Sequence, residues 1–106
     1  MRLKVLVCGS TGLIGHQVFN YLIKSKNYEL YNIAYRVKLN DDTILCDVRN
    51  QDEFIEIVKS ISPDVIINCI GIINTYCKDN NPIGIEKAVR VNSMFPYMLS
   101  EVTALF

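Results

Sequence analysis

Short apolar runs alternate with amphipathic stretches along this chain, which predicts strands alternating with helices. The apolar runs are Leu3–Cys8, Leu30–Tyr35, Ile44–Cys46 and Val65–Cys69. The last run is apolar on both faces, as is typical of a strand inside a parallel sheet. Right-handed crossovers then give the strand order 3-2-1-4 most simply. The predicted fold class is α/β, a partial Rossmann-type doubly wound parallel sheet of about four strands with flanking helices.

Three stretches have the spacing of helices. Residues 13–24 carry apolar side chains three and four positions apart. Asn50 and Glu53 form an Asn-x-x-Glu capping box before a second apolar face, and Pro63 follows where that helix must end. A third helical pattern runs from about Ile83 to the end of the chain, after a predicted loop over residues 74–82.

Composition excludes several classes of protein. The 106 residues are 50% hydrophobic and carry 11 basic and 11 acidic side chains. This content predicts one ordered domain and argues against disorder and against nucleic-acid binding. We find neither a run of ~20 apolar residues nor a signal peptide, so we expect a cytoplasmic protein. The cysteines at 8, 46, 69 and 77 lack Cys-x-x-Cys spacing, so we expect reduced thiols and no metal site.

A glycine-rich turn joins the first predicted strand to the first helix. It reads Gly9-Ser10-Thr11-Gly12-Leu13-Ile14-Gly15. Gly9 would permit a tight turn, Gly12 would let a pyrophosphate approach the backbone, and Gly15 would let the helix pack near the sheet. The free N–H groups of the helix N-terminus would then face the phosphates. These seven residues predict dinucleotide binding, with a purely structural turn as the alternative.

The same stretch, GSTGLIG, resembles the extended branch of the short-chain dehydrogenase/reductase superfamily, and the likeness covers almost the whole chain. The compact loop after the second strand and the run Pro63–Asn68 resemble dTDP-4-dehydrorhamnose reductases and related nucleotide-sugar reductases and epimerases. The resemblance implies a nicotinamide dinucleotide as partner and an NADP-dependent reductase acting on a nucleotide-linked keto-sugar. The alternatives are an epimerase or dehydratase that uses NAD and a non-catalytic protein that senses the dinucleotide.

The residues after the second strand bear on the choice of cofactor. An NAD-selective fold usually has Asp or Glu there to bind the ribose 2′-hydroxyl. This chain has Arg36 and Lys38 instead, which could pair with a 2′-phosphate, so we expect NADP with NAD as second choice. The alternative is a solvated pair of surface charges.

The resemblance also implies roles for residues after the third and fourth strands. Asp47 and Val48 would contact the adenine, unless Asp47 only begins a turn. Cys69, Ile70 and Gly71 match a segment whose backbone follows the ribose and nicotinamide, although Cys69 and Ile70 are larger than usual there. Asn68 is expected to tie its strand to neighbouring strands rather than to touch a ligand.

The family's chemistry requires a Tyr-x-x-x-Lys pair, and no lysine of this chain has a tyrosine four residues before it. We therefore expect no catalytic residue here. Asn92 has a structural or relay role in the resembled helix, and Pro96 would leave its carbonyl without a helical partner. The alternative is an ordinary proline kink. His16 is expected to be incidental or a contact on the phosphate side, and the loop Tyr76–Asp79 to border the substrate.

Two features predict that this chain is the N-terminal part of a longer enzyme. The helical pattern reaches Phe106 without a stop signal. The fourth strand would be an edge of the sheet, yet Val65–Ile67 has no charge or proline to prevent pairing. We therefore also expect self-association through the edge of this strand.

Overall fold

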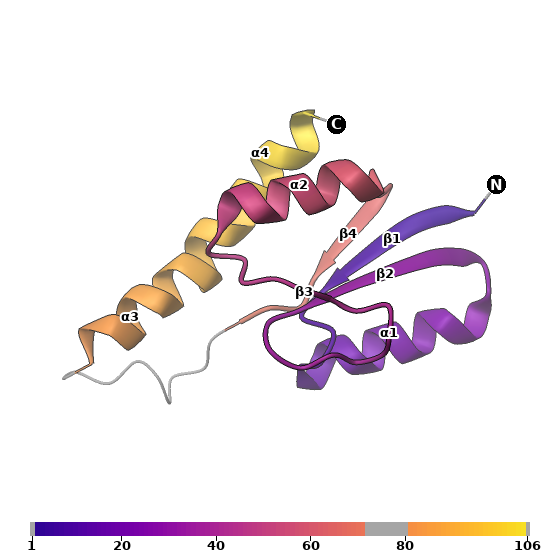
Figure 1. Ribbon diagram of the computed structural model, residues 1–106, viewed down its shortest axis with the longest axis horizontal. Coiled ribbons are helices and arrows are strands. Elements are labelled where there is room, and N and C mark those ends of the chain that lie inside the picture. The colour runs from indigo at the N-terminus through magenta and orange to yellow at the C-terminus, as the bar shows by residue number, and fades with distance from the viewer. Residues whose placement is uncertain (1, 72–80, 106) are drawn as a thin grey trace. The chain divides into compact units, whose positions relative to one another are not determined.

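A computed structural model describes the backbone of residues 2–71 and 81–105 and the side chains of residues 2–71 and 81–101. The chain forms two compact units, Met1–Cys69 and Ile70–Phe106. The first unit holds a parallel sheet of strands β1 (Leu3–Cys8), β2 (Tyr28–Ala34), β3 (Ile44–Leu45) and β4 (Val65–Asn68). Their order is β3-β2-β1-β4, as predicted (Figure 1).

Strand β1 and helix α1 (Leu13–Ser25) lie where the sequence predicts them. Strand β2 begins earlier than expected, because its pairing with β1 starts at Leu3 and Tyr28. It also ends at Ala34, so Tyr35 leaves the strand. Strand β3 has only two residues, although the Cys46 N–H still donates to the Ala34 carbonyl at 2.9 Å.

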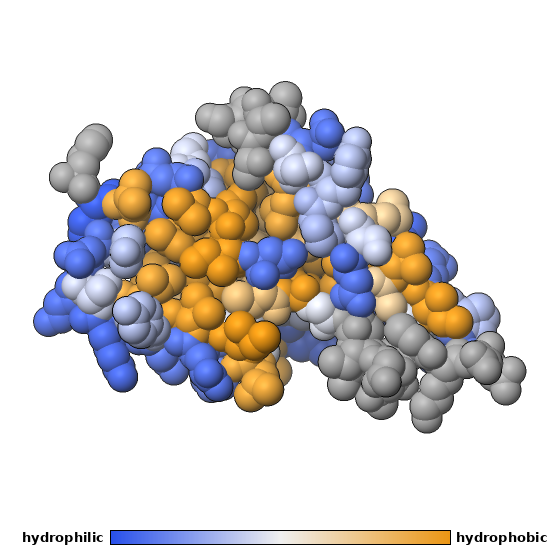
Figure 2. All heavy atoms as spheres, turned by 180° about the vertical axis from the view of Figure 1, so that it is seen from behind, coloured by the Kyte–Doolittle hydropathy of each residue, from blue (hydrophilic) through white to orange (hydrophobic). Residues whose placement is uncertain are grey.

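Helices α1 and α2 (Gln51–Ile61) cover opposite faces of the sheet (Figure 1). On the α1 face, Val5 and Val7 pack with Phe19 in one buried cluster. Figure 2 shows a broad area of apolar side chains over this unit, seen from behind. Val65 of β4 keeps 43% of its surface exposed, and β4 has no second partner strand in the described chain.

The capping box at the start of α2 forms with one difference from its usual arrangement. The Asn50 side chain accepts from the Glu53 N–H at 3.2 Å, as predicted. The Glu53 carboxylate accepts in return from the Asn50 side-chain amide at 3.3 Å, because the Asn50 N–H already donates to the Asp47 carbonyl. The box therefore ties the helix start to the turn that follows β3.

The second unit contains helix α3 (Pro82–Val89), a π-helical turn η2 (Arg90–Met94) and helix α4 (Phe95–Leu105). The single helix expected from about Ile83 is thus interrupted. The Phe95 N–H donates to the Arg90 carbonyl, five residues back, so the chain reaches Pro96 through a wider turn instead of a simple kink. Within the described residues, no helix combines the length and apolarity needed to cross a bilayer.

Candidate functional site

Most of the predicted site residues lie at the carboxyl ends of the four parallel strands, which together form the carboxyl edge of the sheet. The glycine-rich turn follows β1, Arg36 and Lys38 follow β2, and Asp47 and Val48 follow β3. Ligands of open α/β sheets bind at this edge. Cys69 follows β4, where its N–H donates to the Cys8 carbonyl at 2.9 Å.

The three glycines of the turn occupy positions that differ in their need for glycine. Gly9 has φ 82°, in the left-handed region that favours glycine. A Cβ at Gly15 would lie 1.9 Å from the Gly9 carbonyl oxygen, so the close approach of helix and turn requires its absence. A Cβ at Gly12 would lie 3.4 Å from that oxygen, which is an ordinary contact. The internal structure therefore leaves Gly12 free to vary.

The start of α1 has the features of an anion site. Gly12 is the N-cap and no side chain caps the helix. The first of its amides to find an intrahelical partner is that of His16, which donates to the Gly12 carbonyl at 3.1 Å. Thr11, Leu13 and Ile14 are exposed around this terminus, so a ligand can reach the backbone there.

Ser10 and His16 are both occupied by contacts within the protein. The Ser10 side chain is fully buried, and its hydroxyl donates to Asn32 Oδ1 at 2.8 Å. Its N–H donates to the Ile33 carbonyl. His16 Nδ1 donates to the Gly12 carbonyl at 2.9 Å, which fixes the ring against its own first turn. Ser10 thus supports the turn from inside.

Arg36 and Lys38 lie on the exposed segment after β2. The Arg36 guanidinium stacks over the Tyr35 ring, with its central carbon 4.9 Å from the ring centroid. This contact holds a long, mobile side chain near the end of β2 while leaving its donors at the surface.

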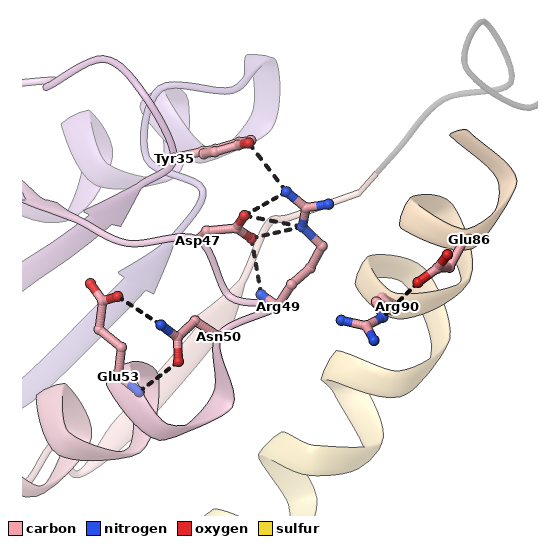
Figure 3. Close-up of polar contacts among 7 residues, drawn as sticks. All are labelled: Tyr35, Asp47, Arg49, Asn50, Glu53, Glu86 and Arg90. Carbon is pink, nitrogen blue, oxygen red and sulfur yellow. Dashed lines mark hydrogen bonds and ion pairs between the residues drawn. The ribbon is translucent and has the colours of Figure 1, made fainter. Parts of the chain in front are cut away.

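Arg49 was missed by the sequence reasoning and is the best-bonded charge at this edge. Figure 3 shows its guanidinium between Asp47 and Tyr35: Nη2 donates to Asp47 Oδ2 at 2.6 Å and to the Tyr35 hydroxyl at 3.3 Å. Nε donates to both Asp47 oxygens. These bonds raise the pKa of Arg49 and fix the Asp47 carboxylate. The only sequence signal was an Arg two residues after Asp47.

The side chains of Val48, Cys46 and Cys8 are buried near the carboxyl ends of the strands, and that of Cys8 is completely so. Burial raises the pKa of the Cys8 thiol to about 12 and that of Cys46 to about 11. Cys8, Cys46 and Cys69 are free thiols. The described residues contain no group of three metal-ligating side chains.

The second unit holds the remaining predicted residues. Ile70 is half-buried and Gly71 exposed. A Cβ at Gly71 would lie 3.7 Å from Asn92 Oδ1, so these two predicted residues are neighbours in this unit. Asn92 lies within η2, and π-helical turns are frequent at functional sites. The loop Tyr76–Asp79 lies outside the described residues.

Comparison with known proteins agrees with this architecture. A model of the family described as "NAD dependent epimerase/dehydratase family" matches residues 5–103. Among curated proteins, none matches this sequence.

Solved structures share the fold. L-threonine dehydrogenase from Phytophthora infestans matches with a TM-score of 0.81 and 21% identity, over 97% of this chain and 33% of its own. A hypothetical dTDP-4-dehydrorhamnose reductase from Sulfolobus tokodaii gives 0.80 and 20%, over 99% and 36%. A short chain dehydrogenase from Leptospira borgpetersenii with bound NAD+ gives 0.74 and 28%, over 97% and 45%. The chain thus spans about a third of the first two. The predicted fold class is confirmed.

Proposed function

This chain belongs to the NAD dependent epimerase/dehydratase family of extended short-chain dehydrogenases/reductases, and on that premise we propose that it binds a nicotinamide dinucleotide, NADP in preference to NAD. The pyrophosphate would lie at the start of α1, the adenine beside Asp47 and Val48, and a 2′-phosphate against Arg36 and Lys38. The backbone of Cys69–Gly71 would follow the ribose and nicotinamide.

One observation carries this proposal: the uncapped N-terminus of α1 directly after a turn that cannot accept a Cβ at Gly15. A helix start without a side-chain cap leaves several N–H donors and a partial positive charge for an anion. The exposed Gly12 allows a phosphate to come close to the backbone. The residues present therefore fit a pyrophosphate.

The preference for NADP rests on charge at the end of β2. No acidic side chain directly follows this strand, whereas Arg36 and Lys38 are exposed there. A guanidinium can bind phosphate oxygens in two parallel hydrogen bonds. Such a pair would favour the dinucleotide that carries the extra phosphate.

For the whole protein we propose a reductase acting on a nucleotide-linked keto-sugar, of which these residues form the cofactor-binding part. The dinucleotide supplies the hydride, and this chain's residues bind and orient it. The Tyr-x-x-x-Lys pair that the family's chemistry requires would lie outside residues 1–106. The short coverage of the matched structures supports this division.

A second candidate is an epimerase or dehydratase that holds NAD. The name of the matching family and the NAD+ bound in the Leptospira borgpetersenii protein favour it. The two candidates differ in whether NADPH is consumed stoichiometrically, which an assay of the whole protein would measure.

Calorimetric titration of this chain with NADP+ and NAD+ tests the proposal. The variant Arg36→Asp should weaken NADP+ binding by about 10- to 150-fold, the value of one charge-assisted hydrogen bond of about 1.5–3 kcal/mol. Its NAD+ affinity should stay the same or rise, because a carboxylate can accept from the 2′-hydroxyl. The matched control is Lys24→Asp, an equal charge change in the last turn of α1.

The control variant should bind both dinucleotides as the wild type does. Failure of the wild type to bind either dinucleotide at millimolar concentration would remove the proposal. An unchanged ratio of the two affinities in Arg36→Asp would remove the assignment of the 2′-phosphate site.

A further inference from the structure

A fully buried asparagine stands in strand β2 beside the apolar core. Asn32 has no exposed surface and pairs in register with Val7 of β1. A buried amide is costly unless its polar atoms are bonded. Here Oδ1 accepts from the hydroxyls of Ser10 at 2.8 Å and Thr43 at 2.6 Å, and Nδ2 donates to Asn40 Oδ1 at 3.4 Å.

Thr43 extends this network into the loop after β2. Its buried hydroxyl donates to Asn32 and accepts from the N–H groups of Leu39 and Asn40, each at 3.0 Å. One donor and two acceptor positions are the full capacity of a hydroxyl. Asn40 Oδ1 also accepts from the Asp42 N–H at 3.0 Å. The loop is thereby held by side chains rather than by strand pairing.

The other arm of the network reaches the glycine-rich turn. Ser10 belongs to that turn, and the N–H groups of Gly9 and Ser10 both donate to the Ile33 carbonyl, next to Asn32. The Asn32 amide therefore connects two loops that are distant in sequence. One loop leads into the uncapped start of α1, and the other carries Arg36 and Lys38.

We propose that Asn32, acting through Ser10 and Thr43, is a positioning residue that holds the Arg36–Lys38 segment at a fixed spacing from the glycine-rich turn and so sets the discrimination between dinucleotides with and without a 2′-phosphate. This inference rests on the proposed function. The pyrophosphate and the 2′-phosphate belong to one ligand, so their separation is limited by covalent structure. Loops that are already held at a matching spacing lose little conformational entropy when such a ligand binds.

The network makes a prediction that general stabilisation does not. Loosening the Arg36–Lys38 segment affects only the ligand that uses both loops. NAD would still bind through the pyrophosphate, whereas NADP would lose the advantage of its extra phosphate. A network that only stabilised the fold would change both affinities by the same factor.

The variant Thr43→Val tests this, because it keeps the shape of the side chain and removes the hydroxyl. In calorimetric titrations we expect its NADP+ affinity to fall about tenfold, as for loss of one ordering hydrogen bond, and its NAD+ affinity to change less than about twofold. Thr43→Ser keeps the hydroxyl and should keep the wild-type ratio. Ile61→Val on α2 is the control for lower stability and should also keep it.

If Thr43→Val does not fold, Asn40→Ala provides a second test, because it removes the acceptor of Asn32 Nδ2. In this variant too, the NADP+ affinity should fall relative to the NAD+ affinity. Equal changes in both affinities, or an unchanged ratio, would overturn the inference while leaving dinucleotide binding intact. A wild type that binds neither dinucleotide would instead overturn the proposed function. A wild type that binds NADP+ and NAD+ equally well would also overturn the inference, because there would be no discrimination between them for the network to set.

Discussion

The most sensitive position in the turn is Gly15, and its replacement by alanine gives a prediction that the structure makes quantitative. The added Cβ would lie 1.9 Å from the Gly9 carbonyl oxygen and 2.7 Å from the carbonyl carbon. Both atoms are backbone, held by bonds from Gly9 and Ser10 to the Ile33 carbonyl. Neither can rotate away as a flexible side chain would.

To restore a contact of 3.4 Å, the start of α1 and the turn would have to separate by about 1.5 Å. This movement would loosen Phe19 from the cluster it forms with Val5 and Val7. Overpacking of this kind costs about 1–3 kcal/mol, and the loss of core contacts adds to it. The better helix propensity of alanine returns about 1 kcal/mol. We expect Gly15→Ala to lower the free energy of unfolding by about 3 kcal/mol.

Urea denaturation followed by circular dichroism measures this loss. The matched control is Gly12→Ala, three residues earlier, where the added Cβ meets the same oxygen at 3.4 Å and the backbone φ is −74°. It should unfold within about 0.5 kcal/mol of the wild type, as exposed substitutions usually do. Equal stability of Gly15→Ala and wild type would refute the steric reasoning about the turn.

Two further predictions concern thiols and the cap of α2. Burial raises the pKa of the Cys8 thiol to about 12 and that of the Cys46 thiol to about 11. Above pH 9 the folded state therefore keeps protons that the unfolded state loses. The free energy of unfolding should fall by about 1.4 kcal/mol per pH unit for each of these thiols between pH 9 and pH 11. Urea melts in that range should show a slope that is smaller by about 1.4 kcal/mol per pH unit in Cys8→Ala, and an identical slope would contradict the assignment. Asn50→Ala removes the acceptor of the Glu53 N–H and should cost about 1 kcal/mol, whereas Ser60→Ala should cost less than half of that in the same assay.

Local signals in the sequence were enough to predict the order of the sheet and the first strand and helix. Apolar runs, capping residues and the glycine spacing act over a few residues, so they can be recognised without knowing the fold. The Asn50 cap is an example, because donor and acceptor are three residues apart. Sheet order then followed from the handedness of crossovers.

The remaining features depend on contacts between residues far apart in sequence. The sequence places Ser10 in the glycine-rich turn but gives no sign that its hydroxyl donates to Asn32, 22 residues away. In the sequence, Asn32 appears only as a polar residue that interrupts the apolar run of β2. Arg49 reaches back to Tyr35 across the edge of the sheet. The π-helical turn before Pro96 was missed because the missing N–H of proline indicates a disruption but not its form.

Because β1 pairs with both β2 and β4, the two pairings differ in the entropy that the folding chain loses when each one forms. Leu3 pairs with Tyr28, 25 residues later, whereas Val5 pairs with Val65, 60 residues later. Loop-closure entropy makes the second pairing more costly than the first. The β1–α1–β2 segment, with the glycine-rich turn, is thus assembled from the more local contacts. The edge strand β4, which leads to Cys69, joins through the most distant ones.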